Sequence, residues 1–286
     1  MDFPTPGIYD GMSAEEYHSI ECASNSGLKH IARSPLHYLS AINEPTEPTA
    51  AMLLGMAVHT AVLEPDTLAS RYVVLPDDRP NRPSQRQRDA KKPSSETLYA
   101  IDWWDAFERE HAGKTIMSSE DMAVVKEMAG SVLLHPVAWD ILQAGKAEQS
   151  VFWIDEETGA ECKARIDWLR GAYPADLKTT DSAAPDDFVR SVVKYRYHCQ
   201  AAMYLDGLAA NGLHADDFPF IVVEKAPPYA VAVYMLDEAA ITEGRRLYRR
   251  DLATYQWCKA TDSWPGYPQE IRELSLPRWA IKGDEE

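Results

Sequence analysis

Two aspartates and a lysine in the second half of the chain have the residue types and spacing that phosphodiester hydrolysis requires. Asp167 is followed by Asp176-Leu177-Lys178. On an extended strand, Asp176 and Lys178 point to one side and Leu177 points to the other. Carboxylate oxygens suit Mg²⁺, so Asp167 and Asp176 are candidate ligands for one or two ions. Bound metal would activate a water, and Lys178 would position that water or stabilise the pentacovalent state.

These residues fall where the hydrophobic period changes from helical to alternating. Strands are expected at residues 150–155, 161–169 and 174–179, with a turn at 156–159. In the second strand, apolar side chains alternate onto one face, while Asp167 shares the other face with Lys163 and Arg165. A solvated antiparallel strand would show the same alternation, and Asp176 and Lys178 would then form only a surface ion pair.

The elements around these strands predict the fold class. A long helix is expected at 186–211, hairpin strands at 218–224 and 229–236, and a helix at 237–260. The first half is predicted to be helical, with short helices between 13 and 40 and longer ones at 49–64, 97–110 and 118–134. We expect an α/β fold with a mixed central sheet flanked by helices. One domain would cover 1–286: a mainly helical part at 1–148 with a basic loop at 79–92, the catalytic core at 149–264, and an irregular tail at 265–286.

Two predicted helices carry further candidate residues. Gly55 and His59 are four residues apart and share a helix face. A neutral imidazole can bind a metal or order a water, although a lone helical histidine is more often structural. On the long helix, Tyr197, Gln200 and Tyr204 share one face.

Together these motifs resemble the PD-(D/E)xK nuclease superfamily, with Asp rather than Glu at the second acidic position. Gly55-Met56-Ala57-Val58-His59 and Gln200-Ala201-Ala202-Met203-Tyr204 resemble the Gly-x-x-x-His helix and the Gln-x-x-x-Tyr pair of the branch that includes helicase-linked recombination nucleases. The resemblance implies a restriction-endonuclease-like core with a helical N-terminal elaboration.

Over residues 8–281 the chain is similar in particular to the prophage RecE-type (exodeoxyribonuclease VIII) family of exonucleases. The similar segments are 24–29, 34–38, 176–180, 195–200 and 274–280. The resemblance implies an Mg²⁺-dependent exonuclease, with Mn²⁺ as an alternative metal, that degrades linear double-stranded DNA 5′ to 3′ without ATP. It also implies 3′ single strands for a RecT-type annealing partner in recombination, and a toroidal homotetramer.

The resemblance assigns roles to individual residues. It implies that Asp167, Asp176 and the carbonyl of Leu177 bind the metal with His59 nearby, and that Lys178 orients the water. Gln200 and Tyr204 would brace the site or the DNA end. The sequence has no Gly-x-x-x-x-Gly-Lys-Ser/Thr loop, which agrees with an ATP-independent reaction. No iron–sulfur cluster is expected, because the cysteines are scattered: Cys22, Cys162, Cys199 and Cys258.

Two basic segments are candidates for contact with DNA phosphates. The first contains Arg79, Arg82, Arg86, Arg88, Lys91 and Lys92, and the second contains Arg245, Arg246, Arg249 and Arg250. Arg245 and Arg249 share a helix face. The alternatives are a solvated, disordered loop and a salt-bridged helix surface or subunit contact. Because the net charge is −16, DNA would be confined to a local basic track.

The scattered cysteines favour free thiols in a reducing cytosol, so we expect a cytoplasmic protein with no membrane partner. The chain starts without the basic and apolar regions of a signal peptide, and no apolar run approaches the roughly 20 residues of a membrane helix. Two other functions stay open: a structure- or sequence-specific endonuclease on the same fold, and an inactive protein that binds DNA ends. The complete set of Asp167, Asp176 and Lys178 speaks against the inactive protein.

Overall fold

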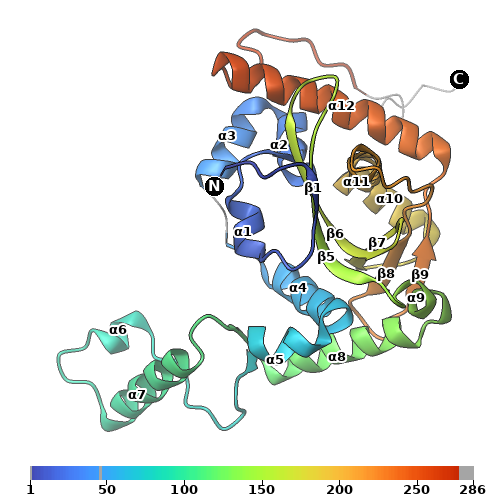
Figure 1. Ribbon diagram of the computed structural model, residues 1–286. Helices are drawn as coiled ribbons and strands as arrows, with labels where there is room; N and C mark the ends of the chain where they lie inside the picture. The colour runs from blue at the N-terminus through green and yellow to red at the C-terminus, as the bar shows by residue number, and fades with distance from the viewer. Residues whose placement is uncertain (1, 45–46, 277–286) are drawn as a thin grey trace, which may run out of the picture.

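A mixed β-sheet forms the centre of the computed structural model, which describes residues 2–44 and 47–276 (Figure 1). Its strand order is β1-β5-β6-β7-β8-β9, and β2 pairs with β6. The strands are β1 (Gly7–Tyr9), β2 (Ala23–Ser24), β5 (Lys146–Ile154), β6 (Glu161–Arg170), β7 (Tyr173–Thr180), β8 (Phe220–Glu224) and β9 (Val231–Tyr234). β7 and β8 are parallel, whereas β5-β6, β6-β7 and β8-β9 are antiparallel. The predicted α/β fold with a mixed sheet is therefore confirmed.

Helices cover both faces of this sheet. On one face, α4 (Ala50–Leu63), α8 (Ser119–Leu134) and α9 (Pro136–Ile141) pack against apolar residues that include Leu177 and Ile221. On the other face, α2 (Asn25–Arg33), α11 (Tyr197–Ala210) and α12 (Glu238–Thr261) pack against Ile166 and its neighbours. α10 (Pro185–Tyr195) joins this second layer through Phe188 and Val192. Within the described residues, no helix is both long enough and apolar enough to cross a membrane.

Polar caps set the starts of the N-terminal helices. Ser13 and Glu16 form a capping box at α1 (Ala14–Ser19). Ser24 caps α2, and Ser34 caps α3 (Pro35–Asn43), where the proline occupies the first turn. Thr49 caps α4 in the same way. These starts agree with the short helices expected from the sequence.

The prediction of one continuous helix at 186–211 is wrong. Arg196 adopts a left-handed backbone conformation (φ 60°), so α10 ends before it and α11 begins after it. This conformation is costly for a residue with a Cβ atom. The Arg196 guanidinium forms an ion pair with the buried carboxylate of Asp251 on α12, which offsets the cost. The contact is remote in sequence, so helical periodicity does not reveal it.

An arm extends from the body between two short parallel strands, β3 (Tyr72–Val74) and β4 (Thr115–Met117) (Figure 1). The 3₁₀ turn Pro65–Thr67 and α5 (Leu68–Arg71) lead into it, and it contains α6 (Gln85–Arg88) and α7 (Ser95–Glu110). Arg82 pairs with Glu108, and Arg88 pairs with Asp105 at 2.8 Å. The basic segment at 79–92 is therefore partly folded onto α7 rather than being a fully solvated loop.

The tail has no helix or strand from residue 265 to 276, as predicted. The rest of the predicted tail, including the motif residues 277–280, lies outside the described residues.

Candidate active site

The two aspartates lie where β6 and β7 separate. Antiparallel pairing between these strands ends at Trp168 and Ala175, and β7 then pairs with β8. Asp167 lies at the fork, where its Oδ2 accepts a hydrogen bond from the backbone N–H of Leu177 at 2.9 Å. The Leu177 side chain is buried in the α4–α8 core, as the strand alternation predicts.

Asp176 and Lys178 form an ion pair on β7 in which Asp176 is buried and Lys178 is partly exposed. Asp176 is 1% exposed; its Oδ1 accepts a hydrogen bond from Gln200 Nε2, and its Oδ2 lies in an ion pair with Lys178 Nζ. Burial lowers the pKa of Lys178, but the charges of Asp176 and Asp167 outweigh burial and keep this pKa above its usual value. The pair therefore holds a protonated ammonium beside the fork.

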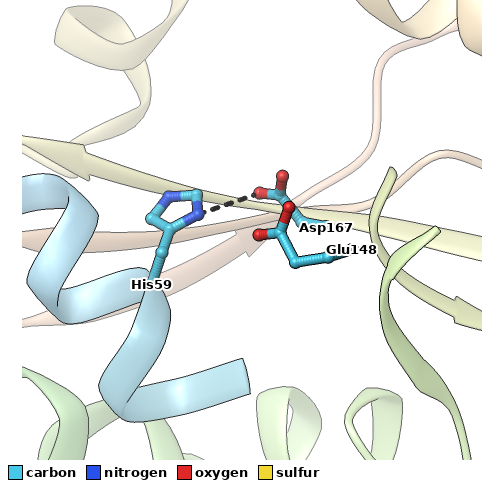
Figure 2. Close-up of side chains that lie close together, drawn as sticks. All are labelled: His59, Glu148 and Asp167. Atoms are coloured by element: carbon cyan, nitrogen blue, oxygen red, sulfur yellow. Dashed lines mark ion pairs between the residues drawn. The ribbon is translucent and has the colours of Figure 1, made fainter. Parts of the chain in front are cut away.

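Asp167, His59 and Glu148 converge from three elements, β6, α4 and β5 (Figure 2). His59 Nδ1 lies 3.4 Å from Asp167 Oδ2, and one ligand atom of each residue lies within 4.8 Å of the others. Glu148 has a positive φ of 52°, an irregularity that accompanies its turn toward the site. Its carboxylate also pairs with Arg165 Nε at 2.5 Å.

The electrostatics of this cluster fit a divalent cation. Burial and the nearby charge of Asp176 raise the pKa of Asp167 well above its usual value. Burial, with the charge of Lys178, lowers the pKa of His59, which favours the neutral imidazole that binds metals. Two carboxylates and an imidazole are a donor set for Mg²⁺ or Mn²⁺. A bound cation would also relieve the repulsion between Asp167 and Asp176.

Asp176 and Leu177, which were also expected to bind metal, lie next to the cluster of His59, Glu148 and Asp167 but are not part of it. Both Asp176 oxygens already face partners, Gln200 and Lys178. The backbone N–H of Leu177 donates to Asp167, so Leu177 is next to the metal-binding atoms. Metal ligation by Asp176 and by the Leu177 carbonyl stays a prediction.

Gln200 and Tyr204 reach the site from α11, as their shared face predicts. Gln200 is buried and holds Asp176 directly. Tyr204 packs between α11 and the sheet, where burial raises its pKa. Gln200 therefore orients an acidic residue, whereas a bracing role for Tyr204 stays a prediction.

The site opens into a cleft of about 1590 Å³ lined by residues of α4, α10, β5 and β7, among them His59, Glu148 and Lys178. Among the described residues, six basic side chains line it: Arg71, Lys146, Arg165, Lys178, Lys194 and Lys225. Only Lys178 was predicted as a site residue, and Glu148 was not predicted at all. These residues are scattered along the sequence, so no local pattern marks them.

The two basic segments differ in how many of their side chains form ion pairs. On α12, Arg245 pairs with Asp206 at 2.9 Å, and Arg249 pairs with Glu157 at 2.8 Å. α12 packs on α11, on the face of the sheet opposite α4 (Figure 1). These contacts favour the salt-bridged alternative for α12. DNA contact by Arg245 and Arg249 stays a prediction.

On the arm, two of the six basic residues, Arg82 and Arg88, are held by carboxylates of α7. The other four have no ion pair within the described part of the chain: Arg79, Arg86, Lys91 and Lys92. The base of the arm lines the cleft through Arg71, Tyr72 and Thr115. The arm is therefore continuous with the cleft wall.

Comparisons with known proteins agree with this architecture. A search of curated protein sequences finds no match. Among solved structures, a protein named "Putative exonuclease" from Eubacterium rectale aligns with a TM-score of 0.61 at 16% identity, covering 94% of this chain and 96% of that one. This likeness shows a shared fold.

A phage related exonuclease from Haemophilus somnus 129PT aligns with a TM-score of 0.33 at 12% identity, over 65% of this chain and 92% of that one. The family model described as "PDDEXK-like domain of unknown function (DUF3799)" matches residues 24–275. The chain therefore belongs to this PDDEXK-like family, within the PD-(D/E)xK nuclease superfamily.

Proposed function

We propose that this protein is a divalent-metal-dependent nuclease that degrades linear double-stranded DNA from its ends. The observation that carries the proposal is the convergence of His59, Glu148 and Asp167 beside the ion pair of Asp176 and Lys178 at the base of an open cleft. Metal-binding carboxylates next to a protonated lysine suit hydrolysis of a phosphodiester bond.

The residues of the site divide the chemical work. A divalent ion held by His59, Glu148 and Asp167 would supply a reactive water and neutralise charge on the scissile phosphate. Lys178 lines the cleft with its ammonium retained, so it can donate hydrogen bonds to the attacking water or to a phosphate oxygen. The Asp176 carboxylate holds the Lys178 ammonium in an ion pair, and the Gln200 side chain donates a hydrogen bond to Asp176.

The finer features of the proposal are supported by the sequence resemblance to RecE-type exonucleases. They are a preference for Mg²⁺, digestion 5′ to 3′ without ATP, release of a 3′ single strand to an annealing protein, and a toroidal tetramer in the cytoplasm. Light scattering of the purified protein tests the tetramer, and a change in mass on adding a RecT-type annealing protein tests the partner.

We place the DNA along the cleft and the free basic residues of the arm. Replacing Arg86, Lys91 and Lys92 together by Gln should weaken DNA binding. It should also reduce the slope of log affinity against log salt concentration by about three, because about three phosphate contacts are lost. Arg245→Gln, a single change on α12, should leave this salt dependence unchanged, because its charge is neutralised by Asp206. Equal losses in both variants would contradict this path.

The function is tested by digestion of 5′- or 3′-labelled linear duplex and of closed circular DNA, with Mg²⁺ or with EDTA. Wild type should degrade only the linear duplex, from its 5′ ends, and Asp176→Ala should be inactive. Equal cleavage of circles would make the protein an endonuclease. Metal-independent binding to ends without any cleavage would make it a DNA-end binding protein.

A further inference from the structure

The break between α10 and α11 places an aromatic ring against the proposed catalytic lysine. Tyr197 is the first residue of α11 and directly follows the left-handed Arg196. Its ring centroid lies 4.7 Å from Lys178 Nζ, within the range of a cation–π contact. Strained backbone in a residue with a side chain persists where the surroundings hold it, and such positions cluster at functional sites.

The surroundings fix the Tyr197 ring from several sides. It stacks on Phe220 at 5.8 Å and on Tyr195 at 5.7 Å between centroids. Phe220 lies on β8 in register with Asp176 on β7. The Tyr197 ring therefore packs beside the strand that carries the buried carboxylate. The ion pair of Arg196 with buried Asp251 anchors the start of α11. The ring is therefore a rigid surface.

Lys178 needs such a surface because its side chain is long and flexible. Its ammonium pairs with the buried Asp176, which draws it into the protein and away from the cleft. Tyr197 lines the cleft together with Lys178. The π face attracts the cation electrostatically and adds no further negative charge to the acidic cluster.

We propose that Tyr197 is a positioning residue for Lys178, and that its ring holds the lysine ammonium at the cleft surface. The proposal rests on the nuclease function proposed above for this site. The position of the ammonium itself is a property of the protein without substrate, so it is measurable even if the nuclease function fails.

One neighbour offers a competing explanation. Lys29 Nζ lies 5.9 Å from the same ring, so removal of the ring would disturb this lysine as well. The variant Lys29→Met removes that contact and leaves the ring and Lys178 in place. If the ring acts through Lys178, Lys29→Met does not reproduce the loss of rate seen on removing the ring.

The kinetic test compares Tyr197→Leu with Tyr197→Phe on linear duplex DNA. The leucine variant should lose kcat roughly tenfold with KM little changed, because a desolvated cation–π contact is lost. The phenylalanine variant keeps the ring and should retain wild-type kcat. Tyr173→Leu is the matched control, since Tyr173 is at the other end of β7 and contacts the Arg170 guanidinium at 5.8 Å.

The second measurement needs no activity. In protein labelled with ¹³C-lysine, the side-chain signals of Lys178, assigned by their loss in Lys178→Met, should be shifted upfield by the ring current. The shift should persist in Tyr197→Phe and vanish in Tyr197→Leu with the fold retained, as checked by thermal unfolding. Absence of the ring-current shift in wild type overturns the inference. A wild-type kcat in Tyr197→Leu also overturns it, and so does a loss of kcat in Lys29→Met equal to that in Tyr197→Leu. An inactive wild type with the shift present would reject only the nuclease function.

Discussion

The protein holds two groups of largely buried carboxylates, one between α11 and α12 and one at the fork of β6 and β7, and the two groups differ in how their charge is balanced. On the α11–α12 side, Asp206 accepts hydrogen bonds from Arg245 and from the Tyr248 hydroxyl. Asp251 meets Arg196 and Arg250 in the same way. No buried carboxylate of this group lacks a cationic partner within the described residues.

At the fork between β6 and β7 the balance is different. Glu148, Asp167 and Asp176 share two cations, Lys178 and Arg165. Burial and the charge of Asp176 raise the pKa of Asp167, a sign that the cluster is short of positive charge. The comparison teaches that a neutralised network serves the fold, whereas an unbalanced one is a candidate metal site.

The largest effect should come from Asp167→Asn. This variant removes a central ligand of the proposed metal site, so nuclease activity should fall by roughly 1000-fold or more. The measurement is the rate of linear duplex digestion with Mg²⁺. Asp206→Asn is the matched control, because it makes the same chemical change in the balanced group. Comparable loss in both variants would remove the distinction between the two groups.

Metal binding should raise the free energy of unfolding only when the group at the fork, which contains Asp167, is intact. At a Mn²⁺ concentration of 100 times its Kd, the free energy of unfolding of wild type should rise by about 2.7 kcal/mol. Thermal unfolding with and without Mn²⁺ measures this. The rise should be retained in Asp206→Asn and absent in Asp167→Asn. A rise that survives in Asp167→Asn would place the metal elsewhere.

Asp206→Asn should instead affect stability. The change leaves Arg245 without its carboxylate partner. The Asp206 side chain is 18% exposed, so we expect a loss of about 2 kcal/mol, below the value for a fully buried pair. Urea unfolding gives the free energy, and digestion should continue at the wild-type rate. A variant as stable as wild type would show that this network contributes little to folding.

The smallest effect should be a pH dependence of the metal-free protein. The folded-state pKa of Asp167 is raised above the ordinary value of 3.8, so the folded protein binds this proton more tightly than the unfolded chain. Its contribution to stability is present at low pH and is lost as the pH rises through the raised pKa. In EDTA at neutral pH, Asp167→Asn should be more stable than wild type, and the difference should shrink on acidification. A difference that grows as the pH falls would contradict the sign.

The sequence by itself determined the strand that carries Asp176 and Lys178, because alternation with buried Leu177 acts within one segment. It also determined the helix starts at Ser13 and Ser34, because capping joins residues three positions apart. His59 and Gln200 followed from motifs on single helices. The geometry of the fork between β6 and β7 brings them together with the two aspartates.

Only the tertiary structure decided the remaining features. Glu148 joins the site through an irregular turn of β5, and helical periodicity gives no sign of the break at Arg196, which depends on Asp251. The charge of Arg245 is neutralised by Asp206, from a different helix. Each of these features depends on a partner far away in the chain. Local periodicity specifies which face of an element is buried, whereas the pairing of charges across elements is set only when the elements pack.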